Sequence, residues 1–148
     1  MTTSIAAGTT ISKSGNFIVN GAATTVTNNG TVNTTAGGIQ FTSGAVWVNA
    51  ANSSLTIRAA VSGIGTFTAS AIPNTMIFAG GGSYTIFSAT VTAGTFHHLT
   101  IQSGGSGSTT KTLSKDITVN GNFTLGNAGS LTTLNVNGKN LTFKGNVS

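Results

Sequence analysis

The sequence contains no cysteine and no glutamate, and its single acidic residue is Asp116. Without cysteine there is neither a disulfide framework nor a thiolate that could act as a metal ligand or nucleophile. One carboxylate side chain cannot supply the pair that glycoside hydrolysis requires, nor the several oxygen ligands of a calcium site. These absences predict a protein that is not an enzyme and that has no catalytic, metal-binding or cofactor-binding residues.

Charge of both signs is scarce, because only 5% of the residues are charged, against about 25% in ordinary globular domains. The net charge of +5 reflects the missing acids, since there are only six basic residues. They are scattered rather than clustered into the basic patch of a nucleic-acid-binding protein, so we expect no nucleic-acid partner. No apolar run approaches the length of a membrane helix, so no membrane span is expected. The six basic residues are Lys13, Arg58, Lys111, Lys115, Lys139 and Lys144.

The chain is rich in residues that form strands and turns. Thr (28), Gly (21), Ser (16) and Asn (15) make up over half of its 148 residues. Short apolar runs alternate with polar residues, and Asn-Gly and Gly-Gly dipeptides separate them, as in all-β proteins. We therefore expect one β-rich domain over residues 1–148, with a flexible loop at 102–111, "QSGGSGSTTK".

Internal repetition suggests how these strands are arranged. "VNG" recurs at residues 19, 119 and 136, and most gaps between six phenylalanines match the length of one solenoid coil. The pattern predicts a right-handed parallel β-solenoid of about 6–7 coils, with those phenylalanines stacked in its core. A β-sandwich or jelly roll is the alternative, with residues 1–14 donated as a strand to the next subunit. The predicted core stack is Phe17, Phe41, Phe67, Phe87, Phe123 and Phe143.

Two polar motifs have the residue types of a binding site. His97 and His98 are adjacent in a predicted strand, so we expect them to point to opposite faces, one half-buried and one toward solvent. Thr-x-Thr occurs four times, and flat threonine arrays on solenoids are known from ice-binding proteins. The irregular spacing of the motif here favours ordinary strand threonines instead. The four pairs are Thr25/Thr27, Thr66/Thr68, Thr90/Thr92 and Thr110/Thr112.

The C-terminal third resembles a known kind of protein. "TFHHLTIQSG", "ITVNGNFTL" and "LNVNGKNLTF", within residues 95–148, are similar to the β-strand repeats of bacterial cell-surface adhesins and autotransporter-like parallel β-helix proteins. The resemblance implies an extracellular or cell-surface location and an adhesive or scaffolding role, with cell-surface or glycan ligands as possible partners. A leader peptide is absent from this chain, so we expect it to have been removed or to lie outside this sequence.

Strand patterns of one type lie at both ends of the sequence, and few charges or prolines protect them. Exposed solenoid ends are adhesive, so we expect copies of the chain to cover one another. The sequence therefore predicts a structural subunit of a self-assembling extracellular filament, pilus-like fibre or sheath, polymerised head to tail without covalent bonds. The alternatives are a binding module cut from a surface adhesin and a viral or phage fibre or decoration protein. The expected interface residues are Asn16, Phe17, Val19, Leu141, Phe143 and Val147.

Overall fold

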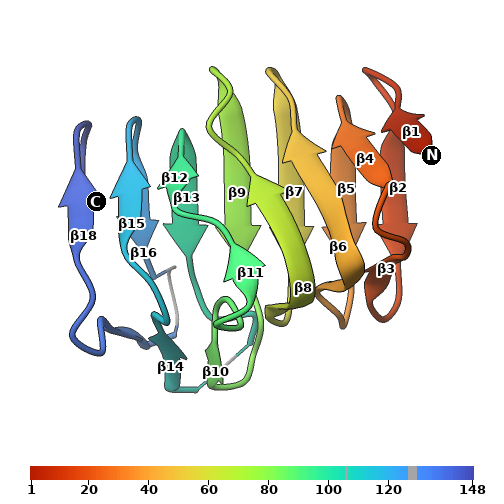
Figure 1. Cartoon of the computed structure of the whole chain (residues 1–148). Helices are drawn as coiled ribbons and strands as arrows, with labels where there is room; N and C mark the ends of the chain where they lie inside the picture. Colours follow the sequence, from red (N-terminus) through yellow and green to blue (C-terminus); the bar gives the residue numbers. More distant parts are fainter. Residues whose placement is uncertain (106, 127–129) are drawn as a thin grey trace.

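The computed structural model describes residues 1–105, 107–126 and 130–148. Within these residues all regular structure is β-strand, and every pair of neighbouring strands is parallel. The chain forms a β-solenoid of about six turns, and its two ends lie at opposite ends of a rod (Figure 1). The predicted parallel solenoid is confirmed, and the alternative sandwich or jelly roll, which requires antiparallel sheets, is excluded.

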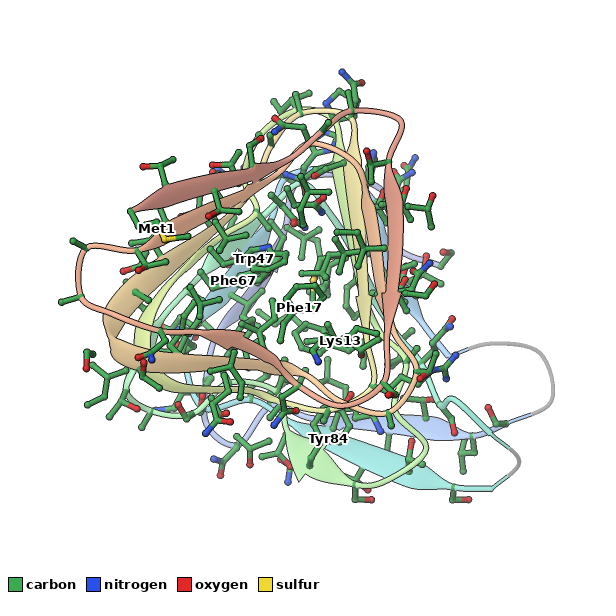
Figure 2. All side chains as sticks on the ribbon, turned by 90° about the vertical axis from the view of Figure 1, so that its right-hand side faces the viewer. Met1, Lys13, Phe17, Trp47, Phe67 and Tyr84 are labelled. Atoms are coloured by element: carbon green, nitrogen blue, oxygen red, sulfur yellow. The ribbon has the colours of Figure 1, made fainter. Side chains whose placement is uncertain are left out.

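Each coil of the solenoid is roughly triangular in cross-section (Figure 2), so the rod has three faces. We name each face after its first strand. The β1 face continues through the second halves of two long strands, β6 (Ile39–Asn49) and β8 (Val61–Thr68), which turn a corner of the triangle. Its other strands are β1 (Thr2–Ile5), β4 (Thr25–Asn28), β11 (Val91–Thr92), β12 (Thr95–Phe96), β15 (Ile117–Val119) and β18 (Leu141–Phe143).

The other two faces complete each coil. The β2 face is a six-stranded sheet: β2 (Thr10–Lys13), β5 (Thr31–Thr34), β7 (Ser53–Ile57), β9 (Asn74–Phe78), β13 (His98–Ile101) and β16 (Phe123–Leu125). The β3 face contains the first halves of β6 and β8, with β3 (Phe17–Val19), β10 (Tyr84–Thr85), β14 (Thr109–Thr112) and β17 (Thr132–Asn135).

Alternation along each strand explains why these sequences form a solenoid. In β7 and β9, for example, every second residue is buried and the residues between them are half-exposed. Successive side chains of a strand point to opposite faces, so one set fills the rod and the other covers it. Burying each large apolar side chain contributes about 1.5–3 kcal/mol. The fully buried set includes Trp47, Leu55, Phe78, Phe87, Phe96 and Ile101.

Buried asparagines line the corner between the β1 and β2 faces. The Nδ2 of Asn28 donates to the Oδ1 of Asn49 at 3.1 Å and to the carbonyl oxygen of Ser54 at 3.0 Å. The same Oδ1 of Asn49 accepts a hydrogen bond from the Nε1 of Trp47 at 3.0 Å. Because buried polar groups are costly unless they are paired, these bonds fix how adjacent coils stack at this corner.

Two segments that the sequence analysis set apart belong to the solenoid. Residues 1–14 supply β1 and β2, which pair with β4 and β5 of the same chain rather than being held out for a neighbour. The expected loop at 102–111 is shorter than predicted, because residues 109–111 begin strand β14 and Lys111 is fully buried. Its residue 106 lies outside the described residues. The glycines and serines that directly precede this strand made the whole stretch resemble a linker.

Candidate functional site

The first coil holds three of the predicted interface residues. Asn16 is exposed, Phe17 is half-buried, and Val19 is 2% exposed. The ring of Phe17 packs edge-on against Trp47 of the third coil, with 5.5 Å between ring centroids. Val19 is covered by its own chain, so Asn16 and Phe17 are the residues of this group that a partner at this end could contact.

The other three predicted interface residues are in the last coil, and two of them are more exposed than Phe17 and Val19. Leu141 is half-buried, Phe143 is 37% exposed, and Val147 is 58% exposed. Phe143 stacks on Phe123 with 4.7 Å between ring centroids, and Val147 forms a parallel bridge to the same residue. Leu141, Phe143 and Val147 continue inward-facing rows of the coil before them, and no other described coil covers them.

The six predicted interface residues therefore lie in two separate groups, and Val19 is the one that is not at a surface. One group is in β3 and the residue directly before it, at one end of the rod. The other group is in β18 and the segment after it, at the opposite end (Figure 1). We call the surfaces at these two ends the first end and the last end. Two different surfaces at opposite ends are the arrangement that head-to-tail contact between copies requires.

The six phenylalanines of the expected core stack do not form one register column. Phe17 and Phe87 lie in the β3-face row that also contains Ile39 and Val61, whereas Phe67 is on the β1 face and Phe123 on the β2 face. Phe41, Phe67, Phe87 and Phe123 are buried, Phe17 is half-buried, and Phe143 is partly exposed. Because the corners differ in length, phenylalanines on different faces can be about one coil length apart in sequence without being register partners. Phe67, Phe87 and Phe96 nevertheless meet in the interior, with centroids 5.8 to 6.3 Å apart.

Cations in the middle of the rod donate to backbone carbonyl groups of a neighbouring coil. Arg58 donates from Nη1 to the carbonyl oxygen of Ala79 at 3.0 Å, and Lys115 donates from Nζ to the carbonyl oxygen of Val91. Lys13 and Lys144, in the first and last coils, make no side-chain hydrogen bond or ion pair with any described residue. Lys13 points into the cross-section at the first end (Figure 2).

Lys111 is the most deeply buried of these cations. Its Nζ donates to the carbonyl oxygen of Gly80 at 2.9 Å and to that of Gly82, and lies 4.3 Å from the centroid of the Tyr84 ring. Burial lowers the pKa of Lys111 and raises the pKa of Tyr84 to about 12. The sequence analysis missed this cluster, because Lys111 was assigned to a loop and nothing local signals that carbonyl groups would surround it.

The two histidines are side by side rather than on opposite faces. Their ring centroids are 4.0 Å apart, and the rings are nearly perpendicular. The expectation was wrong because β12 ends at Phe96 and β13 begins at His98, so His97 sits in the corner, where strand alternation does not hold. The Nδ1 of His98 accepts a hydrogen bond from the backbone N–H of Asn122 at 2.9 Å. Burial, with a smaller effect of His97, lowers the pKa of His98.

The single carboxylate has a local partner. The Oδ1 of Asp116 accepts a hydrogen bond from the backbone N–H of Asn140 at 2.9 Å, and its Oδ2 faces the Nδ2 of the same residue at 3.4 Å. These bonds lower the pKa of Asp116, with a smaller contribution from Lys139. Asp116 thus ties the last coil to the one before it.

The described part of the chain shows neither an enclosed pocket nor a group of three or more metal-ligating side chains. Among the same residues there is no helix of the length and apolarity needed to cross a bilayer.

Comparison of the chain with protein-family models, with curated proteins and with solved structures finds no match.

Proposed function

We propose that the chain is a structural subunit of a self-assembling extracellular filament whose copies join head to tail without covalent bonds. The observation that carries this proposal is the pair of unlike end surfaces. At the first end, one edge of β1 has no strand partner among the described residues, and at the last end the same holds for β18. Unpaired N–H and C=O groups on such edges are a template for another strand.

The geometry of the two edges supports a parallel contact. β1 and β18 belong to the same face of the rod, and strands run parallel along this face. If β1 of one copy stacks on β18 of another, the contact repeats the pairing that already holds each coil to the next. An end-to-end contact between unlike surfaces does not close on itself, so it generates an open filament.

Apolar surface at the last end supports the same contact. Phe143 and Val147 are exposed in rows that are buried elsewhere in the rod. A copy that covered them would remove apolar area from water, which contributes roughly 25 cal/mol for each Å². Lys13 and Lys144, which lack side-chain partners among the described residues, would then lie beside carbonyl groups of the next copy, as Arg58 and Lys115 do within the rod.

Two other functions predict different assemblies. If the chain is a binding module from a surface adhesin, further coils of the same polypeptide cover the ends, and the reading frame continues beyond residue 148. If it is a viral or phage fibre or decoration protein, it forms oligomers of fixed size. The extracellular location is part of the proposal, supported by a charge-poor surface rich in Thr, Ser and Asn.

Gel filtration with negative-stain electron microscopy tests the proposal. The wild-type chain should form long unbranched fibres. A Val147→Glu variant should remain monomeric, because stacking would bury an unpaired carboxylate at a cost of several kcal/mol. Ile64→Glu is the matched control, because Ile64 is 61% exposed in the middle of the rod and Val147 is 58% exposed. A stable wild-type monomer, or fibres of equal yield from both variants, would contradict head-to-tail assembly.

A further inference from the structure

The outward side chains of the β1 face form two rows of register partners along the rod. In the first row, Thr2 pairs with Thr25, Thr25 with Val46, Val46 with Thr66, and Thr66 with Thr92. The second row lies two residues further along the strands. It contains Ser4, Thr27, Val48, Thr68, Thr95, Thr118 and Thr142. None of these side chains is buried.

Two of the four Thr-x-Thr pairs, Thr25/Thr27 and Thr66/Thr68, lie in these rows, whereas Thr110/Thr112 is in β14 on the β3 face. Successive members of the second row are between 20 and 27 positions apart in sequence, yet they occupy equivalent places in successive coils. The extra residues are taken up at the corners of the triangle, for instance in 79–83 between β9 and β10. Irregular sequence spacing therefore produces a regular surface.

The spacing of the rows follows from strand geometry. Neighbouring strands are about 4.8 Å apart, and every second residue of a strand is about 6.6 Å from the last. All members of both rows except Ser4 are threonine or valine, whose branched Cβ restricts χ1. Threonine and valine have the same shape, so Val46 and Val48 keep the methyl rows continuous where two hydroxyl groups are lost. The face thus presents a two-dimensional grid of methyl and hydroxyl groups.

The hydroxyl groups of this grid are available to water. Those of Thr25, Thr27, Thr66 and Thr68 make no hydrogen bond with any described residue. Ser4 is different, because its Oγ accepts a hydrogen bond from the Nδ2 of Asn29 at 2.8 Å. The rows contain no charged side chain, and the terminal ammonium group of Met1, which precedes Thr2, donates to the carbonyl oxygen of Ala23 at 2.8 Å.

We infer that the β1 face binds the surface of ice. Methyl groups restrict the orientation of the water next to them, and the free hydroxyl groups anchor that water on the grid. The partner that fits is uncharged, repeats in two dimensions at similar intervals, and both donates and accepts hydrogen bonds everywhere. A crystal face of ice has these properties, whereas a soluble protein or a single glycan chain does not repeat on such a grid. The inference does not depend on filament assembly.

The β2 face provides an internal comparison. Its outward rows contain Thr10, Thr31, Ser54, Thr75, His98 and Asn122, and beside them Ser12, Asn33, Thr56, Ile77, Thr100 and Thr124. Asparagine, histidine and isoleucine interrupt the threonines, and two neighbouring hydroxyls, of Thr124 and Ser148, hydrogen-bond each other at 3.0 Å. This face has the same strand spacing without a uniform grid, so variants on it are suitable controls.

The experiment measures thermal hysteresis and inhibition of ice recrystallisation for the purified chain. A Thr27→Tyr/Thr68→Tyr variant alters the second row of the β1 face, and Thr56→Tyr/Thr100→Tyr makes the same change on the β2 face. All four threonines are half-exposed. We expect activity in the wild type, its loss in the β1-face variant and its retention in the β2-face variant, with melting temperature as a check of folding.

Two results would overturn the inference. One is a wild-type chain with no effect on ice growth, and the other is an equal loss of activity in both variants. If the β1-face pair does not fold, Thr66→Val replaces one hydroxyl of the grid by a methyl group of the same shape. It should lower activity without changing the melting temperature appreciably, and full activity in Thr66→Val together with Thr25→Val would likewise exclude anchoring by these hydroxyl groups.

Discussion

Lys111 and Tyr84 are register partners on the β3 face, and the ammonium nitrogen of Lys111 lies 4.3 Å from the centroid of the Tyr84 ring. The cation is therefore held by a ring and by the carbonyl groups of Gly80 and Gly82, with no carboxylate nearby. Cation–π contacts are worth about 2 kcal/mol when desolvated, and hydrogen bonds to charged groups add about 1.5–3 kcal/mol each. These contacts offset the cost of burying the charge.

The first prediction concerns alkaline pH and the variant Tyr84→Phe. The pKa of Tyr84 rises from its ordinary value of 10.0 to about 12 on folding. The unfolded chain therefore loses the tyrosine proton first, so the stabilising contribution of Tyr84 is complete below pH 10 and is lost between pH 10 and 12. Tyr84→Phe should abolish this loss, as measured by urea unfolding at a series of pH values.

Lys111 gives the opposite trend in the same experiment. Its pKa is lower in the folded chain than its ordinary value of 10.5, so the unfolded chain binds more protons and stability rises as the pH increases toward 10.5. This rise should be clear in Tyr84→Phe, where the tyrosine no longer masks it. It should be smaller in Tyr84→Phe/Lys111→Met, where only Lys115, whose pKa burial also lowers, still contributes. The hydroxyl of Tyr84 is buried and is paired at most weakly, with the backbone of Gly80, so Tyr84→Phe should change stability little at pH 7. A marked loss there would show that the hydroxyl is strongly paired.

The second prediction concerns acidic pH and His98. Its Nδ1 accepts the backbone N–H of Asn122, which requires the neutral ring, and burial lowers its pKa below the ordinary value of 6.5. The unfolded chain is protonated first as the pH falls, so stability should decrease below pH 6.5. We expect the decrease in thermal unfolding scans of the wild type and not in His98→Asn. His97→Asn is the control, and it should retain a smaller decrease, because His97 makes the lesser contribution to the shift.

Local pattern in the sequence was enough to predict the strands and the parallel solenoid, because alternation and turn dipeptides act over a few residues. Features that depend on which residues stack were not predictable from spacing. Lys111 was hidden at the end of a glycine-rich stretch, and the ring of His97 was misplaced because the chain turns a corner there. The alignment of Thr27 with Thr68 through Val48 depends on corners of unequal length, whose lengths follow from the packing of the whole rod. The six residues expected at an interface lie in the first and last coils, but the sequence did not show that Val19 is covered.

The third prediction compares two glycines that have similar backbone angles and different surroundings. Gly44, in the corner of β6, has φ of +75° and nothing within 4 Å of the position that a Cβ would occupy. Gly63, in β8, has φ of +87°, and a Cβ there would lie 1.9 Å from the carbonyl oxygen of Phe41 in the preceding coil. Both substitutions to alanine impose the left-handed backbone on a residue with a Cβ, at a cost of about 1–2 kcal/mol.

Only Gly63→Ala also forces two coils apart. Gly44→Ala should therefore lower the free energy of unfolding by about 1–2 kcal/mol, whereas Gly63→Ala should lower it by more than about 4 kcal/mol, the range of severe packing defects. Urea unfolding followed by circular dichroism measures both values under identical conditions. Equal losses in the two variants would mean that the coils can separate at Gly63 without cost. The close approach of Gly63 to Phe41 would then not be what sets the spacing of the β3 face, and the regular rows on the adjoining β1 face would need another cause.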